Sequence, residues 1–167
     1  VAGGQVDQYD FSRLSRLTPT LDAPVFVGTA DAAVLRGTRR PSLLNRKGLF
    51  QRATGPLVRP PTLPIWDVED GDTIGSFIAY HTPGHTPGHS AFLSADRDVA
   101  MLGDLVRSRN GGLAPSPWVL SHDSRRVRES IRTLADRAPP FAVACPGHGR
   151  PLRRGGLAAL RAVTAGG

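Results

Sequence analysis

SFIAYHTPGHTPGHSAFLS, residues 76–94, is the stretch of the sequence that is most informative about the fold. Its apolar ends, 76–80 and 90–94, are typical of buried strands. Between them a Thr-Pro-Gly-His unit occurs twice in succession. Proline fixes the backbone and glycine allows close approach. The segment therefore predicts two strands joined by a rigid loop that presents imidazole groups.

Outward from this segment, strands and helices are predicted to alternate along the chain. The clearest helix signal covers 124–137, because Val127, Ile131 and Leu134 form an apolar stripe and Asp123 or Ser124 can cap its start. The other predicted elements are a helix over 7–17, a strand over 24–28, a helix from Thr29 to Gly37, a strand over 98–103, a loop over 105–122, a strand over 141–145 and a helix over 156–164.

This alternation predicts an α/β (α+β) fold. A length of 167 residues suits a single domain, which we place at 1–167. Residues 38–64 lack periodicity and are rich in proline and glycine. They form an irregular excursion, longer than a compact domain usually contains without a function. Such an excursion either lines a binding site or is a surface loop.

Composition limits the class of protein. The net charge of +7 permits nucleic-acid binding, but Lys47 is the only lysine, the arginines are scattered, and aromatic residues make up only 6%. This argues against nucleic acid as a partner. Cys145 is the only cysteine, so no internal disulfide can form. No apolar run approaches the ~20 residues of a membrane span. We therefore expect a cytoplasmic protein without a membrane partner.

Three polar residues follow predicted strands in glycine-containing turns: His85, Asp104 and His148. Strand ends are where α/β sheets present functional groups. Imidazole and carboxylate together are the ligands of Zn²⁺ and similar ions. Taken singly, each has an ordinary explanation: a strand-end histidine is commonly a hydrogen-bonded surface residue, and Gly-Asp is commonly a turn. Their recurrence at three strand ends favours a metal site.

The order TPGHT, then GD, then PGHG resembles the later motifs of the metallo-β-lactamase superfamily, with the glyoxalase II-like branch as the closest match. The resemblance implies a partial αββα sandwich. It makes His85 a ligand of one metal, Asp104 the catalytic carboxylate that bridges two metals, and His148 a ligand of the second. One or two divalent ions are implied, zinc first, with iron or manganese as alternatives.

The implied activity is hydrolysis of a thioester, ester or lactone-type bond in a small-molecule substrate, through a metal-bound hydroxide. The family's first motif, His-x-His-x-Asp-His, is absent, and the opening Val1-Ala2-Gly3-Gly4 resembles the stretch that follows it. We therefore expect an N-terminally truncated C-terminal portion with impaired activity, which self-associates through an exposed sheet. The alternatives are an inactive binding module and a nucleic-acid-processing member of the superfamily.

Other polar residues near these motifs have smaller expected roles. His81 and His89 flank the loop, and Cys145 precedes the PGHG turn; we expect all three to support the ligands rather than to bind metal. Arg107 and Arg109 either meet an anionic substrate or are solvated. No residue can be assigned to substrate binding from the sequence.

Overall fold

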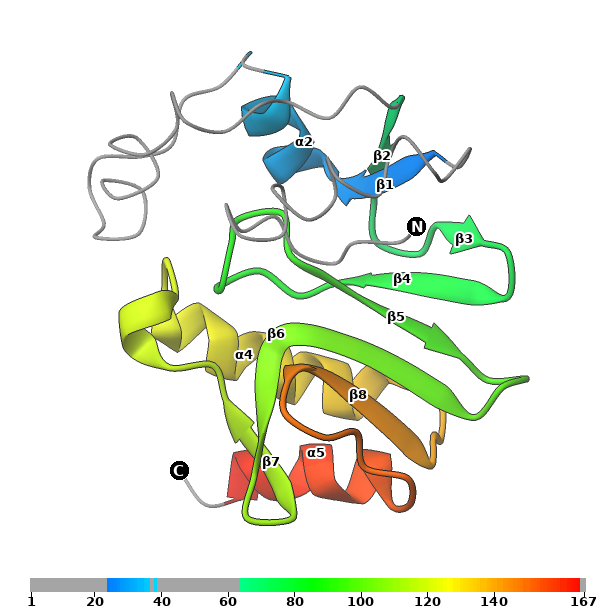
Figure 1. Ribbon diagram of the computed structural model, residues 1–167, viewed down its shortest axis with the longest axis vertical. Helices are drawn as coiled ribbons and strands as arrows, with labels where there is room; N and C mark the ends of the chain where they lie inside the picture. Colours follow the sequence, from blue (N-terminus) through cyan, green and yellow to red (C-terminus); the bar gives the residue numbers. More distant parts are fainter. Residues whose placement is uncertain (1–23, 37, 39–63, 166–167) are drawn as a thin grey trace.

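The computed structural model describes residues 24–36, 38 and 64–165, and shows a mixed α/β fold (Figure 1). The helix predicted over 7–17 lies outside these residues. So does the excursion predicted over 38–64, apart from its two end residues. The single-domain assignment of 1–167 therefore stays a prediction.

The strands form two sheets. In the first, β1 (Val25–Gly28) pairs in parallel with β2 (Ile65–Val68). The second has six strands in the order β3-β4-β5-β6-β7, and β8 pairs in parallel with β6. Its strands are β3 (Thr73–Ile74), β4 (Phe77–His81), β5 (Ser90–Ser94), β6 (Val99–Arg109), β7 (Gly112–Pro115) and β8 (Val143–His148).

Apolar contacts stack these sheets and the helices into four layers. Helix α2 (Thr29–Leu35) covers the outer face of the first sheet, where Ala32 packs with Val25 and Val27. Between the sheets, Val68 of β2 packs with Phe92 of β5. This is the αββα order that the resemblance implied.

The largest apolar cluster lies on the outer face of the second sheet. There α4 (Ser124–Arg137) and α5 (Gly156–Ala165) cover β5, β6 and β8 (Figure 1). Ile131 of α4 and Leu160 of α5 are fully buried in this cluster. The second sheet is thus fixed by helices on one face, so that polar side chains on its other face and at its edge are held on a rigid support.

Two predicted elements match the structure to the residue. The strand over 90–94 is β5, and the helix over 124–137 is α4. Asp123 caps the helix by accepting a hydrogen bond from the backbone N–H of Arg126 at 2.9 Å. The predicted cap is confirmed.

The prediction of a loop over 105–122 is wrong for residues 105–109 and 112–115, which belong to strands. Strand β6 continues to Arg109 and turns at Asn110 and Gly111 into β7. Both turn residues have positive φ, 51° and 77°, as a two-residue type I′ hairpin requires. The strand predicted over 141–145 begins later and extends to His148, and β2 was not predicted at all.

No helix in the part of the chain that the structure describes is long and apolar enough to cross a membrane.

Candidate metal centre

The loop of residues 82–89, which we call the His85 loop, is closed by its own backbone. The N–H of Thr82 donates to the carbonyl of His89 at 2.9 Å, and the N–H of Gly84 donates to the carbonyl of Thr86 at 3.0 Å. Because these bonds span the loop, its conformation is set locally, as the two Pro-Gly pairs predicted. The loop holds His85 between the ends of β4 and β5.

His85 is 2% exposed, and its ring is oriented by Ser116. Nδ1 of His85 lies 3.0 Å from Oγ of Ser116, which follows β7. With Nδ1 engaged by the hydroxyl, Nε2 is the nitrogen directed at Asp104. Such a partner fixes both the tautomer and the orientation of an imidazole. Ser116 was not singled out from the sequence, because nothing nearby in the chain marks it.

Asp104 lies inside β6 and not after a strand, which corrects the predicted placement. The register of β6 against β8 is irregular on both sides of Gly103, and Gly103 has φ 52°. A bulge of this kind re-aims the next side chain and is common beside functional sites. Asp104 is 4% exposed, so its carboxylate is buried.

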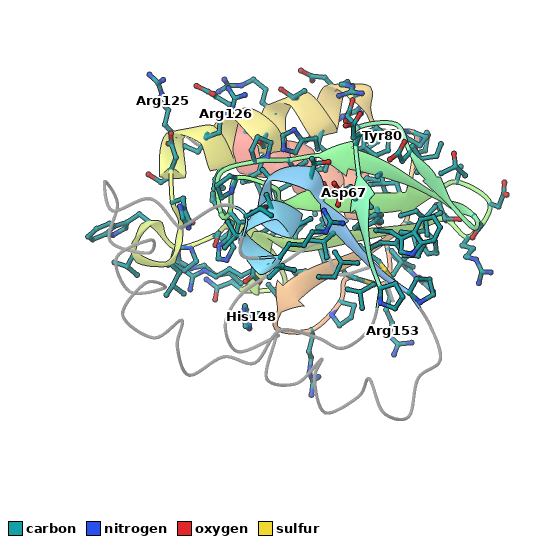
Figure 2. All side chains as sticks on the ribbon, turned by 90° about the horizontal axis from the view of Figure 1, so that it is seen from above. Asp67, Tyr80, Arg125, Arg126, His148 and Arg153 are labelled. Atoms are coloured by element: carbon teal, nitrogen blue, oxygen red, sulfur yellow. The ribbon has the colours of Figure 1, made fainter. Side chains whose placement is uncertain are left out.

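His148 is the last residue of β8, and its side chain is 75% exposed. Figure 2 shows it at the end of β8, on the side of the molecule away from Arg125 and Arg126 of α4. The preceding Gly147 passes very close to Asp104, since a Cβ there would lie 2.0 Å from Oδ1 of Asp104. Only glycine at this position lets the end of β8, which carries His148, reach the carboxylate.

The structure brings the three predicted residues together, with Asp104 between His85 and His148. Nε2 of His85 lies 3.3 Å from Oδ2 of Asp104, and Nε2 of His148 lies 3.4 Å from Oδ1. Charge-assisted N–H···O bonds are shorter, about 2.7–2.9 Å. Two ligand atoms at about 2.0–2.2 Å from a tetrahedral zinc ion lie roughly 3.3–3.6 Å apart. Both separations therefore fit a metal ion between each histidine and one oxygen of Asp104.

The donor set is incomplete within residues 24–36, 38 and 64–165. There, no three His, Cys, Asp or Glu side chains gather closely enough to hold one metal ion. Instead, two pairs share Asp104. Each oxygen of Asp104 could hold an ion together with one histidine, which would give two donors to each position.

The neighbouring histidines brace the loop. His89 is fully buried, its Nδ1 lies 2.8 Å from Oγ1 of Thr82, and its ring meets that of His85 edge to face at 6.3 Å. His81 is exposed, and its Nε2 donates to the carbonyl of Pro87 at 3.1 Å. Both contacts agree with supporting roles, which remain predictions.

Cys145 and Arg107 lie on the strands that carry the site. Cys145 is in β8 opposite Met101 of β6, and its partial burial raises the pKa of the thiol, which keeps it protonated at neutral pH. Arg107 is in β6 directly opposite His148, so the two residues share a face of the sheet. Arg109 is exposed at the far end of β6.

The chain is similar in sequence to one superfamily of known proteins. Residues 12–148 match the family model of the Metallo-beta-lactamase superfamily. The chain therefore belongs to the metallo-β-lactamase superfamily.

Among curated proteins, the uncharacterized protein YobT of Bacillus subtilis (strain 168) is 37% identical over 101 residues, which cover 55% of this chain and 42% of that protein. The match thus spans less than half the length of this relative.

Among solved structures, the di-iron-bound form of TTHA1623 is 26% identical with a TM-score of 0.63, covering 93% of this chain and 69% of that one. The BLEG-1 B3 metallo-beta-lactamase is 25% identical with a TM-score of 0.57, covering 83% of this chain and 63% of that one. The chain shares the metallo-β-lactamase fold with both.

The Ser116→Ala variant is expected to lower the affinity for divalent metal by ~10–100-fold, because it removes the hydroxyl that orients His85. Chelator competition measures this affinity. Ser121→Ala is the matched control: Ser121 is equally buried, in the segment that follows β7, but its hydroxyl bonds to the carbonyl of Pro117. An equal loss in both variants, or none in Ser116→Ala, would show that Ser116 does not orient a ligand.

Proposed function

We propose that His85, Asp104 and His148 bind one or two divalent metal ions in a hydrolase centre for thioester, ester or lactone-type bonds, of the glyoxalase II-like kind. The observation that supports this is the position of Asp104: each of its oxygens faces a different histidine at a separation that fits a metal ion. A direct charge-assisted hydrogen bond between a histidine and a carboxylate has a shorter N···O distance than either of these separations.

Each of the three residues has a part in this centre. Metal ions bound there would supply Lewis acidity and would lower the pKa of bound water to about 7. Asp104, buried and fixed in a strand, keeps its two oxygens apart for two positions. His85 is held rigidly from the protein side, whereas His148 is exposed and marks the side from which a small-molecule substrate enters.

Zinc is the first choice of metal, because two imidazoles and a carboxylate are typical zinc donors. Iron and manganese are the alternatives, since imidazole also suits iron and carboxylate suits manganese. The structure of TTHA1623, which is similar to this chain, is described as di-iron-bound.

We expect this chain to bind zinc weakly and to hydrolyse slowly. Each position has two donors among the described residues, the sequence contains no His-x-His-x-Asp-His, and catalytic zinc generally requires three protein ligands. Dialysis followed by metal analysis is expected to give less than one ion per chain. Stoichiometric metal that survives dialysis would mean that further residues complete the site.

The incomplete donor set also favours a second candidate, an inactive module that binds a partner. Steady-state assays with thioester, ester and lactone substrates, in excess Zn²⁺, Mn²⁺ or Fe²⁺, separate the two. A hydrolase gives metal-dependent turnover that His85→Ala abolishes. Turnover that is absent under every metal, or unchanged in His85→Ala, contradicts the hydrolase proposal.

A cytoplasmic location stays a prediction.

Self-association is expected because apolar side chains are exposed on the inner faces of both sheets. Trp66 is 59% exposed beside Phe26, and Met101 is 43% exposed opposite Phe92. Phe26 and Phe92 point into the layer between the sheets. Sedimentation is expected to show concentration-dependent association that a double Trp66→Ser, Met101→Ser variant weakens. Trp118→Ser, at an exposed tryptophan in another region, is the control; a monomeric wild type would contradict the expectation.

A further inference from the structure

The His85 loop is held from two sides by different helices. On one side, the N–H of Asp123 donates to the carbonyl of Gly84 at 2.9 Å, and the hydroxyl of Ser130 donates to the carbonyl of Pro83 at 2.7 Å. Both donors belong to α4 and its cap. On the other side, the contact comes from Asp31 in the first turn of α2.

Asp31 is a buried carboxylate that accepts two hydrogen bonds from this loop. The hydroxyl of Thr86 donates to Oδ2, and the N–H of Gly88 donates to Oδ1 at 2.8 Å. Asp31 is 5% exposed and Thr86 2% exposed. A buried carboxylate is costly unless it is hydrogen-bonded, so these bonds resist displacement. Thr86 directly follows His85, which places one anchor beside the imidazole.

The approach of α2 to the loop leaves no free space. A Cβ on Gly28 would lie 1.9 Å from the carbonyl oxygen of Gly88, and a Cβ on Gly88 would lie 2.6 Å from the backbone nitrogen of Asp31. Backbone meets backbone at both points, so the loop cannot move any closer to α2. The β1–α2 unit therefore packs directly against the loop as well as bonding to it through Asp31.

We infer that Asp31 is a positioning residue for the metal centre: it fixes Thr86 and Gly88, and through them the imidazole of His85. The β1–α2 unit thereby raises metal affinity through a residue that lies outside β6 and β8, the strands that carry Asp104 and His148. The inference rests on the proposed function, because His85 must be a ligand for metal affinity to report on it. The sequence alone shows no link between α2 and the loop.

Four variants of the full chain test this. Thr86→Val removes the hydroxyl at nearly constant volume, and Thr86→Ser retains it. Asp31→Asn keeps the shape and removes the charge. Thr29→Val is the matched control, since Thr29 lies on the same helix but its hydroxyl donates to Val68 of β2 at 3.3 Å.

The first measurement is Co²⁺ affinity by chelator competition. Thr86→Val and Asp31→Asn are expected to weaken it by ~10–100-fold, the effect typical of residues that orient a ligand. Thr86→Ser and Thr29→Val are expected to leave it unchanged. Unchanged affinity in both Thr86→Val and Asp31→Asn, or an equal loss in Thr29→Val, would overturn the inference.

The second measurement is amide hydrogen exchange of the metal-free protein. Faster exchange confined to residues 82–89 in Thr86→Val, and absent in Thr29→Val, is expected. If the wild type binds no cobalt, the proposed function fails, and this measurement alone decides whether Asp31 positions the loop. Equal exchange in wild type and Thr86→Val would then refute it.

Discussion

The Asp104→Asn variant is expected to lose metal binding by more than ~100-fold and to lose any metal-dependent hydrolysis with it. The change is isosteric, but an amide nitrogen has no lone pair for a metal, so one of the two histidines keeps no partner oxygen. Loss of a shared ligand should exceed the ~10–100-fold typical of residues that only orient ligands. Chelator competition and kcat/KM in excess metal measure the two effects.

Asp96→Asn is the control for this variant, because Asp96 is exposed in the turn between β5 and β6 of the same sheet. It removes the same charge without approaching the site. Wild-type metal affinity in Asp104→Asn would mean that the carboxylate does not bind metal, and the assignment of all three ligands would fail.

The Gly147→Ala variant is expected to destabilise the fold and to weaken metal binding together. The added methyl would lie 2.0 Å from Oδ1 and 3.0 Å from Cγ of Asp104, so either the carboxylate or the end of β8 that carries His148 must move. Overpacking of this kind costs about 1–3 kcal/mol. Chemical unfolding gives the free energy of unfolding, and chelator competition gives the metal affinity.

Gly112→Ala provides the matched control for Gly147→Ala. A Cβ on Gly112 meets only the carbonyl oxygen of Arg109, at 3.7 Å, which is an ordinary contact. It is expected to change neither quantity appreciably. If Gly147→Ala has the same free energy of unfolding and the same metal affinity as the wild type, the close approach of β8 to Asp104 is not required.

Elements with strong local signals were predictable from the sequence. Helix α4 was placed correctly because its apolar stripe, its Asp123 cap and the prolines after it all agree. Strand β5 was placed correctly because a short apolar run lies between two turns. Each signal lies within the element or directly beside it, and no distant contact is needed to interpret it.

Elements that depend on pairing were missed. Strand β2 is four residues long, without alternation, and exists because it pairs with β1 across the chain. The hairpin of β6 and β7 did carry a signal, Asn110-Gly111, which favours a type I′ turn, and the loop prediction overlooked it. The bulge at Gly103 arises from pairing with β8, which no local pattern indicates.

The candidate site was predictable only in part for the same reason. His85, Asp104 and His148 lie in recognisable glycine-containing motifs. Ser116 and Asp31 do not, because they act across 31 and 55 residues of chain, through the hydroxyl–imidazole contact to His85 and the carboxylate–hydroxyl bond to Thr86. Such partners become visible only once the fold places them together.

Anomalous diffraction at the metal edge, from crystals of this chain grown with excess Zn²⁺, tests the central claim most directly. With one ion bound, a peak is expected between Nε2 of His85 and Oδ2 of Asp104, at about 2.0–2.2 Å from both atoms. With two ions bound, a second peak is expected between Nε2 of His148 and Oδ1 of Asp104, at the same distances. Two occupied positions should lie ~3.5–4 Å apart. Strong peaks at other histidines, with none at Asp104, would contradict the account.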